Sequence, residues 1–586
     1  MIYLRSNLKS VRPSSAEGYQ TNFDINESFF DEDKIPDYQE LLSKDSEELF
    51  IPVCKSKIMC KPVRWPVECQ CLNETIQHIY YVPLLKELLY CSTGKEERSQ
   101  PIAPKEGSVL YRYPVSTLNQ FRRSTANKYI LPACPYSDPL CLKFESRYEC
   151  GNLAKAVKVT FLCYELHLRP DLYTKRYSSW FYFRVTNMQK DYKYRLSIVN
   201  LAKFDSLYKQ GLKPLMYSVR DAEKRKVGWR RCGENITYYS NKILKDVQEE
   251  YRKFHTLTFV VEFPHENDVV YFANCYPYSY TDLKRYLCKL SKHPLKSKYT
   301  SIRVLCKTLA NNDLYYVTIT SPLAKTKKTN SSVKEKTMIE KRAVIITARV
   351  HPSETPSSWI MKGFLDFLTS SKPTAKKLRD KYIFKLVPML NPDGVIVGNA
   401  RFSLRASDLN RQYRSPSRTS YPTIWYTKLL IERSLEKHGI AIYCDLHAHS
   451  KSHDIFLFGC ENQPNMDKRL EEQVFAAMLQ KNAANKFSLE KCKYNVEQTK
   501  VGTARVVMGM MGVPISFTME ASVGGSRLGI RKNTHFTVED YEQMAYSFCE
   551  TILDFYGNDP EIQRDKKTIE EGLRRNNAKK ILKYIR

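Results

Sequence analysis

The stretch AVIITARVHPSETPSSWIMKGFLDFL, residues 343–368, joins a continuous apolar run to a segment with helical spacing. A continuous apolar run such as 343–350 is typical of a strand buried on both faces of a sheet. Segment 357–371 predicts a helix, and Ser357 and Ser358 at its front are candidate caps. Between the two lie His351 and Glu354, three positions apart, whose side chains both bind metals.

The same alternation continues along the chain. Buried-type strands are predicted at 382–394, 440–450 and 513–522, and helices at 423–439 and 538–557. Strands that alternate with helices predict an α/β domain, with helices on both faces of its sheet.

Residues 142–285 carry a different pattern. Short runs alternate aromatic or β-branched residues with polar ones, as in 178–188 and 256–280, and turn signals separate the runs. This pattern predicts an antiparallel β-sandwich. The sequence therefore predicts four parts: an irregular, partly disordered segment at 1–140, the sandwich at 141–290, the α/β domain at 291–557 and a basic tail at 558–586.

Candidate ligands fall at the ends of the predicted strands, where sites gather in open α/β sheets. His351 and Glu354 follow the strand at 343–350, and His447 ends the one at 440–450. Two histidines and one glutamate are a catalytic zinc set, which leaves one coordination position for water. Glu520, at the end of the strand at 513–522, is the candidate that takes a proton from this water.

Each of these residues has a structural alternative. A single His-x-x-Glu has low specificity, His447 alone fits a hydrogen-bonded histidine at a strand end, and Glu520 alone fits a solvated carboxylate. His449 shares the strand parity of His447, so one of the two is not a ligand, and we assign His449 a structural role. The order of these residues and their shared place at strand ends favour the metal site.

Composition limits the classes of partner. The 586 residues are too many for one core, and the net charge is +30, with 93 Lys and Arg against 63 Asp and Glu. Such a charge attracts polyanions, which include both nucleic acids and acidic protein tails. No zinc finger, P-loop or RNA-recognition signature is present, so nucleic acid is not expected. The sequence has no signal peptide and no membrane-spanning window, so we expect a cytoplasmic chain with reduced thiols and no membrane partner.

Five short motifs carry a resemblance: HPSE at 351–354, NPDG at 391–394, DLNR at 408–411, DLHAHS at 445–450 and TME at 518–520. With them the chain resembles the zinc carboxypeptidases, and among these the cytosolic carboxypeptidases that trim glutamates from tubulin. WFYFRVTNM, GLKPLMYS, GWRRCGENITYYSN and YFANCYPYSYTDL resemble the amino-terminal β-sandwich of that subfamily. The resemblance covers about 142–556 and implies a zinc-carboxypeptidase catalytic domain, a mixed sheet flanked by helices, at 291–557.

The resemblance also implies roles for single residues. His351, Glu354 and His447 match the ligands of one Zn²⁺ ion. Glu520 matches the general base and acid. Arg401, in GNARFSL, matches the arginine that polarises the scissile carbonyl and stabilises the oxyanion.

Three further residues match the positions that bind substrate. Asn410 and Arg411 correspond to the pair that holds the terminal carboxylate, and Arg505, in VGTARVV, falls where the family sets side-chain preference. A cation there favours an acidic side chain, although a surface arginine is the competing interpretation of Arg505. The chain departs from the usual pattern at several places: Ser353 and Ala448 replace glycine, Phe402 replaces cysteine, and ASVGGSRLG at 521–529 replaces the usual Phe-Cys-Gly stretch.

The implied activity is hydrolysis of C-terminal or side-chain-linked glutamates from polyglutamylated proteins, tubulin among them, with association to microtubules, centrioles or cilia as a further expectation. Two alternatives remain open. The chain could remove another C-terminal residue such as tyrosine, or it could bind microtubules or acidic tails without catalysis. The sequence does not fix the oligomeric state.

Overall fold

The computed structural model describes residues 51–52, 58, 61–66, 69–72, 74, 76–80, 85–102, 107–113, 140–174, 177–244, 253–322, 341–460 and 470–585. These residues belong to one compact unit. Most of the segment predicted as irregular, 1–140, lies outside them.

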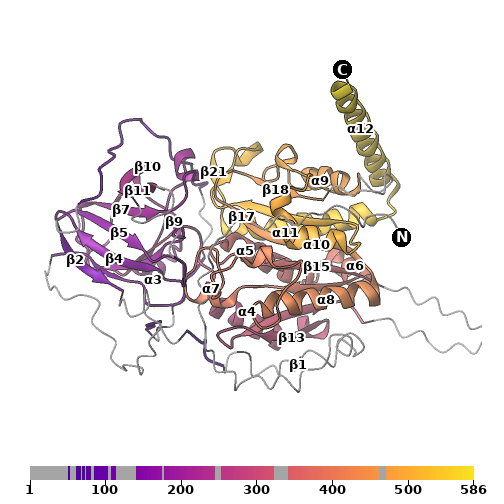
Figure 1. The fold of residues 1–586 in the computed structure, drawn as a ribbon, viewed down its shortest axis with the longest axis horizontal. Helices are drawn as coiled ribbons and strands as arrows, with labels where there is room; N and C mark the ends of the chain where they lie inside the picture. The colour runs from indigo at the N-terminus through magenta and orange to yellow at the C-terminus, as the bar shows by residue number, and fades with distance from the viewer. Residues whose placement is uncertain are drawn as a thin grey trace, which may run out of the picture. The chain divides into compact units, whose positions relative to one another are not determined.

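An eight-stranded mixed sheet forms the centre of the carboxyl-terminal half (Figure 1). Its strands, in spatial order, are β1 (Ile51–Pro52), β13 (Thr300–Lys307), β14 (Asp313–Ile319), β16 (Tyr382–Val387), β15 (Arg342–Ala348), β17 (Ile440–His449), β19 (Ser516–Ser522) and β18 (Ile455–Phe458). β16, β15, β17 and β19 run parallel, whereas the strands outside them pair antiparallel. The carboxyl ends of the four parallel strands therefore meet at one edge.

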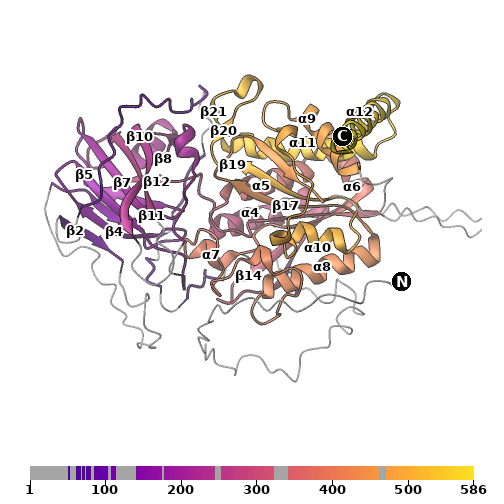
Figure 2. The ribbon, with the colours of Figure 1, turned by 45° about the horizontal axis from the view of Figure 1, so that its top comes forward.

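Helices cover both faces of this sheet, as predicted (Figure 2). On one face α5 (Thr355–Leu368), α6 (Pro373–Lys381), α9 (Glu471–Asn482) and α11 (Val538–Tyr556) contact one another. On the other face α8 (Pro422–His438) contacts β13 and β15, and α10 (Ala504–Met510) contacts β17 and β19. The other α-helices of the described residues are α3 (Val219–Arg225), α4 (Tyr280–Lys292), α7 (Pro392–Ile396) and α12 (Pro560–Ile585).

Local signals in the sequence explain where the long helices begin and end. α11 starts with a capping box, in which Thr537 and Asp540 each bond the other's backbone N–H. α8 starts with Pro422 and stops before Gly439, whose φ of 63° lies in the left-handed region that favours glycine. The prediction that serines cap α5 is wrong, because Glu354 occupies the N-cap position without a side-chain bond, and Ser357 lies inside the helix.

Two facing sheets form the amino-terminal sandwich (Figure 1). The six-stranded sheet has the order β10 (Glu234–Leu244), β11 (Lys253–Glu262), β7 (Lys193–Leu201), β5 (Cys163–Leu168), β4 (Leu153–Lys158) and β2 (Ser108–Arg112). The five-stranded sheet has the order β3 (Lys143–Glu145), β6 (Tyr182–Thr186), β12 (Val270–Ala273), β8 (Leu215–Ser218) and β9 (Arg230–Arg231). All pairs are antiparallel except β5 with β7. Between the sheets, the rings of Phe259 on β11 and Phe272 on β12 are 5.9 Å apart.

The predicted fold class, a β-sandwich followed by an α/β domain with a mixed sheet, is confirmed. The predicted domain boundaries stay a prediction. β2 comes from before residue 141 and joins the sandwich, and most of the predicted basic tail forms α12.

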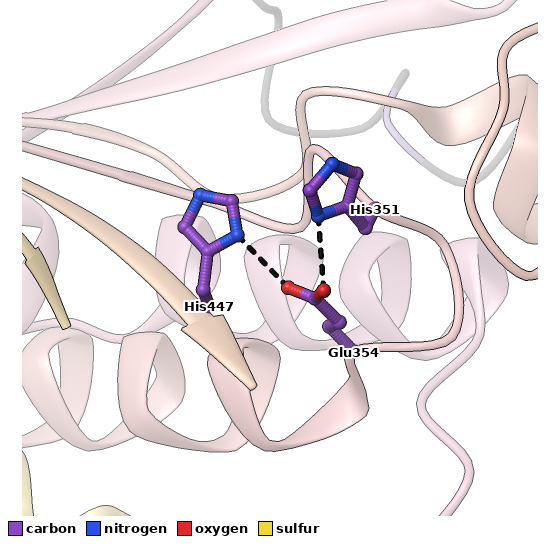
Figure 3. A group of neighbouring side chains, drawn as sticks. All are labelled: His351, Glu354 and His447. Carbon is purple, nitrogen blue, oxygen red and sulfur yellow. Dashed lines mark hydrogen bonds and ion pairs between the residues drawn. The ribbon is translucent and has the colours of Figure 1, made fainter. Parts of the chain in front are cut away.

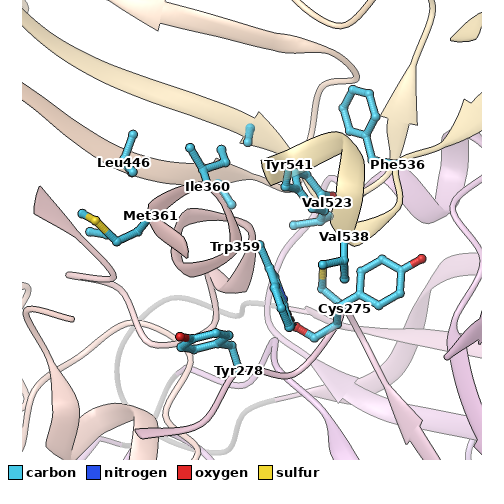
Figure 4. Close-up of a cluster of buried hydrophobic side chains, with 14 of the residues drawn as sticks. Cys275, Tyr278, Trp359, Ile360, Met361, Leu446, Val523, Phe536, Val538 and Tyr541 are labelled. Atoms are coloured by element: carbon cyan, nitrogen blue, oxygen red, sulfur yellow. Dashed lines mark hydrogen bonds between the residues drawn. The ribbon is translucent and has the colours of Figure 1, made fainter. Parts of the chain in front are cut away.

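A buried apolar cluster joins the sandwich to the α/β half (Figure 4). Cys275 and Tyr278 follow β12, and Trp359 on α5 packs beside them, with the Trp359 and Tyr278 rings 4.9 Å apart. The Trp359 indole N–H donates to the Tyr276 carbonyl. Because α5 begins just after Glu354, this contact ties the sandwich to the segment that carries two candidate metal ligands.

The cysteines that the structure describes are free thiols, in line with the expected reduced state. Within the described ranges, no helix combines the length and the apolar character that crossing a membrane requires.

Candidate metal centre

Two strand ends and one helix start bring the three predicted ligands together (Figure 3). His351 follows β15, Glu354 occupies the position just before α5, and His447 lies near the end of β17. The two Glu354 oxygens face the two histidines, each 2.9 Å from an Nδ1 atom. One ligand atom from each residue fits within a 4.8 Å group.

Arg349 shapes the turn that carries His351 and Glu354. Its φ of 60° lies in the left-handed region, and its guanidinium is fully buried. It donates to the Pro352 carbonyl at 2.7 Å, the Tyr278 carbonyl at 3.0 Å and the Ser358 hydroxyl at 2.9 Å. These three hydrogen bonds hold the turn in place. Burial lowers the pKa of Arg349 to about 10.

A second carboxylate stands behind each histidine. Asp408 lies 3.0 Å from Nε2 of His351, and Asp445 lies 2.8 Å from Nε2 of His447. An Nε2–H that donates to a carboxylate fixes the tautomer and leaves Nδ1 as the free electron pair. Both Nδ1 atoms then point to the same place as the Glu354 carboxylate (Figure 3).

The charges around this cluster favour a cation at its centre. Burial works to raise the pKa of Glu354, but His351 and His447 hold it well below its usual range. Burial works to lower the pKa of His447, but Asp445 and Glu354 raise it well above its usual value. A buried site with this excess of carboxylates attracts positive charge.

The donor set fits zinc. Two imidazole nitrogens and one carboxylate are the ligands of a catalytic zinc site, and the carboxylates behind the histidines complete the usual outer layer. His351, Glu354 and His447 are therefore the residues that would hold the ion.

Glu520 lies directly beside the cluster, because β19 pairs with β17 so that Glu520 is opposite His447. Its Oε2 atom is buried and has no hydrogen-bond partner. Burial raises the pKa of Glu520 to about 7, although the nearby His447 opposes the shift. An unpartnered carboxylate beside a metal site can accept or hold a proton.

Arg401 reaches the same site from a loop that the sandwich holds. Its Nε and Nη2 atoms donate to Asp408 at 3.0 and 2.6 Å. Asp171, which is buried and follows β5, accepts the backbone N–H groups of Ala400, Arg401 and Phe402 at 2.5, 2.7 and 2.8 Å. A carboxylate of the sandwich thus fixes the backbone that carries Arg401.

The predicted substrate-binding residues lie on two segments that contact each other, and one of these segments reaches His447. Asn410 Nδ2 lies 3.3 Å from His447 Nε2, and Asn410 Oδ1 accepts the Ala504 backbone N–H at the start of α10. Arg411 is the next residue in the chain, and Arg505 is the second residue of α10. Asn410 therefore lies beside His447, and its contact with Ala504 brings the start of α10, which carries Arg505, close to it.

His449 lies outside the candidate metal group of the described residues. Its Nδ1 accepts the backbone N–H groups of Lys451 and Ser452. Burial lowers the pKa of His449 to about 4. These contacts agree with the structural role predicted for it.

Two comparisons with known sequences identify the chain's relatives. Residues 144–274 match the cytosolic carboxypeptidase N-terminal domain, and residues 285–548 match the zinc carboxypeptidase family. Cytosolic carboxypeptidase 2 of Danio rerio is 44% identical over 505 residues, which cover 85% of this chain and 68% of that protein. The chain belongs to the cytosolic carboxypeptidase family. The cofactor of the zinc carboxypeptidases is zinc, in agreement with the predicted ion.

Other relatives of this family are longer. Cytosolic carboxypeptidases 2 and 3 of Mus musculus are each 45% identical, over 87% and 84% of this chain. The chain spans 58% and 49% of their lengths.

Solved structures share the fold of this chain. A metallo-carboxypeptidase from Burkholderia cenocepacia, at 19% identity, covers 71% of this chain and 98% of its own, with a TM-score of 0.55. A putative carboxypeptidase from Burkholderia mallei, also at 19% identity, covers 71% of this chain and 97% of its own, with a TM-score of 0.57.

Sequence reasoning missed four residues that support this candidate metal site: Asp408, Asp445, Arg349 and Asp171. Asp408 and Asp445 stand inside two of the motifs, and the rule that ligand histidines donate to carboxylates was a signal for them. Asp171 lies 230 positions before Arg401, and no local pattern marks this pairing.

Proposed function

We propose that this chain is a zinc carboxypeptidase that removes C-terminal or side-chain-linked glutamates from polyglutamylated proteins, tubulin among them. The family and the His–Glu–His cluster support the carboxypeptidase chemistry. The preference for glutamate depends on one residue, Arg505.

Arg505 is a buried cation without an anion. Its exposed fraction is 6%, and its Nε has no hydrogen-bond partner. Among the described residues, no carboxylate lies within ion-pair distance of its guanidinium. The guanidinium lies over the ring of Phe458, 5.5 Å from the ring centre. Both oxygens of the neighbouring Glu472 are occupied by the backbone N–H groups of Cys460 and Ser516. Because an unpaired buried charge is costly, Arg505 favours a ligand that brings a carboxylate.

Asn410 and Arg411 provide a second anchor beside Arg505. The Ala504 backbone N–H at the start of α10 holds the Asn410 side chain beside His447, and the guanidinium of Arg411 is partly exposed. Arginine binds carboxylates in a bidentate manner. A C-terminal glutamate has two carboxylates, and these two anchors would each take one of them.

The protein's own groups then surround the scissile bond. Zinc, when bound, supplies a Lewis acid that polarises the carbonyl and lowers the pKa of water. Glu520 accepts a proton at its free Oε2 and returns it to the leaving amine. Arg401, once it exchanges Asp408 for substrate, donates to the developing oxyanion.

The net charge of +30 favours acidic proteins as partners for this activity. A basic surface attracts acidic polyglutamate tails and speeds encounter, with an effect that salt screens. We place the activity in the cytoplasm, in keeping with the names of the relatives, and expect association with microtubules, centrioles or cilia.

The decisive experiment offers the purified chain three peptides that differ only in their last residue, which is Glu, Gln or Tyr. Released amino acids are followed by mass spectrometry, with and without a chelator. We expect release of Glu above Gln and Tyr, and loss of release after chelation. Preferred release of Tyr would replace the glutamate assignment with the alternative carboxypeptidase, and tight salt-sensitive binding without any release would indicate a non-catalytic binder.

Two variants test the roles of single residues. Glu520→Gln should keep zinc and lower kcat by about 10²- to 10⁴-fold. Arg505→Met should lower kcat/KM for the Glu peptide by about 10- to 100-fold and for the Gln peptide far less, because only the Glu peptide loses an ion pair with the guanidinium. Arg564→Met, an exposed arginine on α12, is the matched control. Equal losses of kcat/KM on both peptides would show that Arg505 does not recognise the acidic side chain of the last residue.

A further inference from the structure

A pocket lies where the sandwich meets the metal cluster. Glu354 and Ser353 line it from the turn before α5, and Ser450 lines it from the segment after β17. The sandwich contributes Lys203, Tyr208 and Asn274. Arg401, Asn410, Arg411 and Arg505 are absent from its lining.

Lys203 is the cation of this pocket. It follows β7, and its Nζ donates to the Ser450 hydroxyl at 2.9 Å. No carboxylate of the described residues comes within ion-pair distance of it. The charges that act on it most strongly after its burial are those of Glu354 and Arg401, so its ammonium group is electrostatically part of the metal site.

A second donor lies in the same pocket. The Tyr208 hydroxyl donates to Oδ1 of Asn274 at 3.0 Å, which leaves the Asn274 amide N–H groups as donors. Lys203 and Asn274 therefore both offer N–H groups, as the recognition of a carboxylate requires. Burial lowers the pKa of Lys203, because a charged ammonium group is less stable in a buried pocket where no carboxylate of the described residues pairs with it.

The position of this pocket determines which part of a substrate reaches it. In the proposed function, Asn410, Arg411 and Arg505 hold the released residue. The scissile bond then lies at His351, Glu354 and His447. The rest of the substrate must continue past the other side of the ligands, where the pocket contacts Glu354 and Ala448.

We infer that Lys203 binds an acidic side chain of the substrate on the amino-terminal side of the scissile bond. This inference rests on the proposed function. It extends that function, because the enzyme would then recognise acidic residues before the scissile bond as well as the last residue. Ser353 and Ala448, two departures from the usual family pattern, line the same pocket and so adjust the room available to that side chain.

The test compares two peptides that share a terminal glutamate. One carries glutamates at the preceding positions and the other carries glutamines. In the wild-type enzyme the acidic peptide should have a kcat/KM about 10- to 100-fold higher, as expected for one charge-assisted hydrogen bond in a partly buried site. Lys203→Met should remove most of this preference and leave the peptide with glutamines nearly unchanged.

Lys209→Met is the matched control, because Lys209 is an exposed lysine of the same segment that contacts Phe204 and does not line the pocket. It removes the same charge and should preserve the preference, which separates local recognition from long-range attraction. Zinc content and melting temperature are measured for each variant.

The outcomes distinguish the two proposals. If no peptide loses its glutamate, the proposed function fails. If both peptides lose glutamate at equal rates in the wild type, or if Lys203→Met slows both equally, the proposed function stands and the role of Lys203 is refuted. The wild-type comparison decides the matter even if Lys203→Met does not fold.

Discussion

Asp408 lies 3.0 Å from Nε2 of His351 through one carboxylate oxygen, while its other oxygen accepts two hydrogen bonds from Arg401. One carboxylate thus orients a metal ligand and holds the arginine assigned to the oxyanion. Burial works to raise the pKa of Asp408, but the bonded His351 and the nearby Arg401 hold it well below its usual range. This direction of shift favours the ionised form of Asp408 near neutral pH.

Asp408→Asn should weaken zinc binding by about 10- to 100-fold, the usual cost of removing a partner that orients a ligand histidine. Asparagine can still accept the Asn410 backbone N–H that Asp408 accepts, so the local turn should survive. Competition with a chelator of known affinity measures the change. Asp380→Asn, a partly exposed carboxylate that pairs with Lys376, is the control, and an unchanged zinc affinity in Asp408→Asn would contradict the prediction.

Asp171→Ala should lower kcat/KM by about 10- to 100-fold without loss of zinc, because a small displacement of a catalytic group has a cost of this size. The substitution removes the acceptor of three backbone N–H groups and releases the loop that carries Arg401. Kinetics with the glutamate peptide and a metal assay test both parts.

Glu266→Ala, at an exposed turn of the sandwich, controls for a general effect of the domain. Wild-type kinetics in Asp171→Ala would show that Arg401 keeps its position without this carboxylate. Loss of zinc together with activity would show that the sandwich supports the whole site and not this loop alone.

The strands and helices near the site were predictable because their signals are local. The apolar run at 343–350 and the helical spacing that follows correspond to β15 and α5, and the strand at 440–450 corresponds to β17. The order of the residues and their placement at strand ends together were enough to group His351, Glu354 and His447.

The contacts that support the ligands could not be predicted in the same way. Lys203 and Asp171 reach the site from another domain, and their partners Ser450 and Arg401 lie more than 200 positions away. Sequence periodicity reports which face of an element is buried, but it does not report which distant side chain will lie against it. The prediction of the α5 cap was wrong for a related reason. The N-cap position is occupied by Glu354, whose side chain belongs to the metal cluster.

Glu472 should make the protein less stable as the pH rises through neutrality. Burial raises the pKa of Glu472 to about 8 from its ordinary 4.5. Between these two values the folded protein binds a proton that the unfolded chain has released, so the free energy of unfolding falls as pH rises from 4.5 to about 8. Glu472→Gln, which has no charge at any pH, should show a smaller fall in melting temperature across this window.

The control for this prediction is Glu497→Gln, at an exposed position of the same half of the molecule. It should follow the wild-type dependence on pH. A Glu472→Gln protein whose melting temperature falls as steeply as that of the wild type would show that Glu472 does not hold its proton in the folded state.

Gly363→Ala should destabilise the protein by about 1–3 kcal/mol, the usual cost of an extra methyl group in a packed core. Gly363 lies on α5 where α11 crosses it, and a Cβ atom there would come within 3.0 Å of the Glu542 backbone. Backbone atoms cannot move away as a flexible side chain can, so the two helices must separate. Because α5 begins directly after Glu354, a shift of α5 also displaces this candidate ligand. We therefore expect a lower denaturation midpoint and weaker zinc binding together. Gly572→Ala on α12, where a Cβ atom would meet nothing within 4 Å, should leave both values unchanged, and equal behaviour of the two variants would contradict the close contact of α5 with α11.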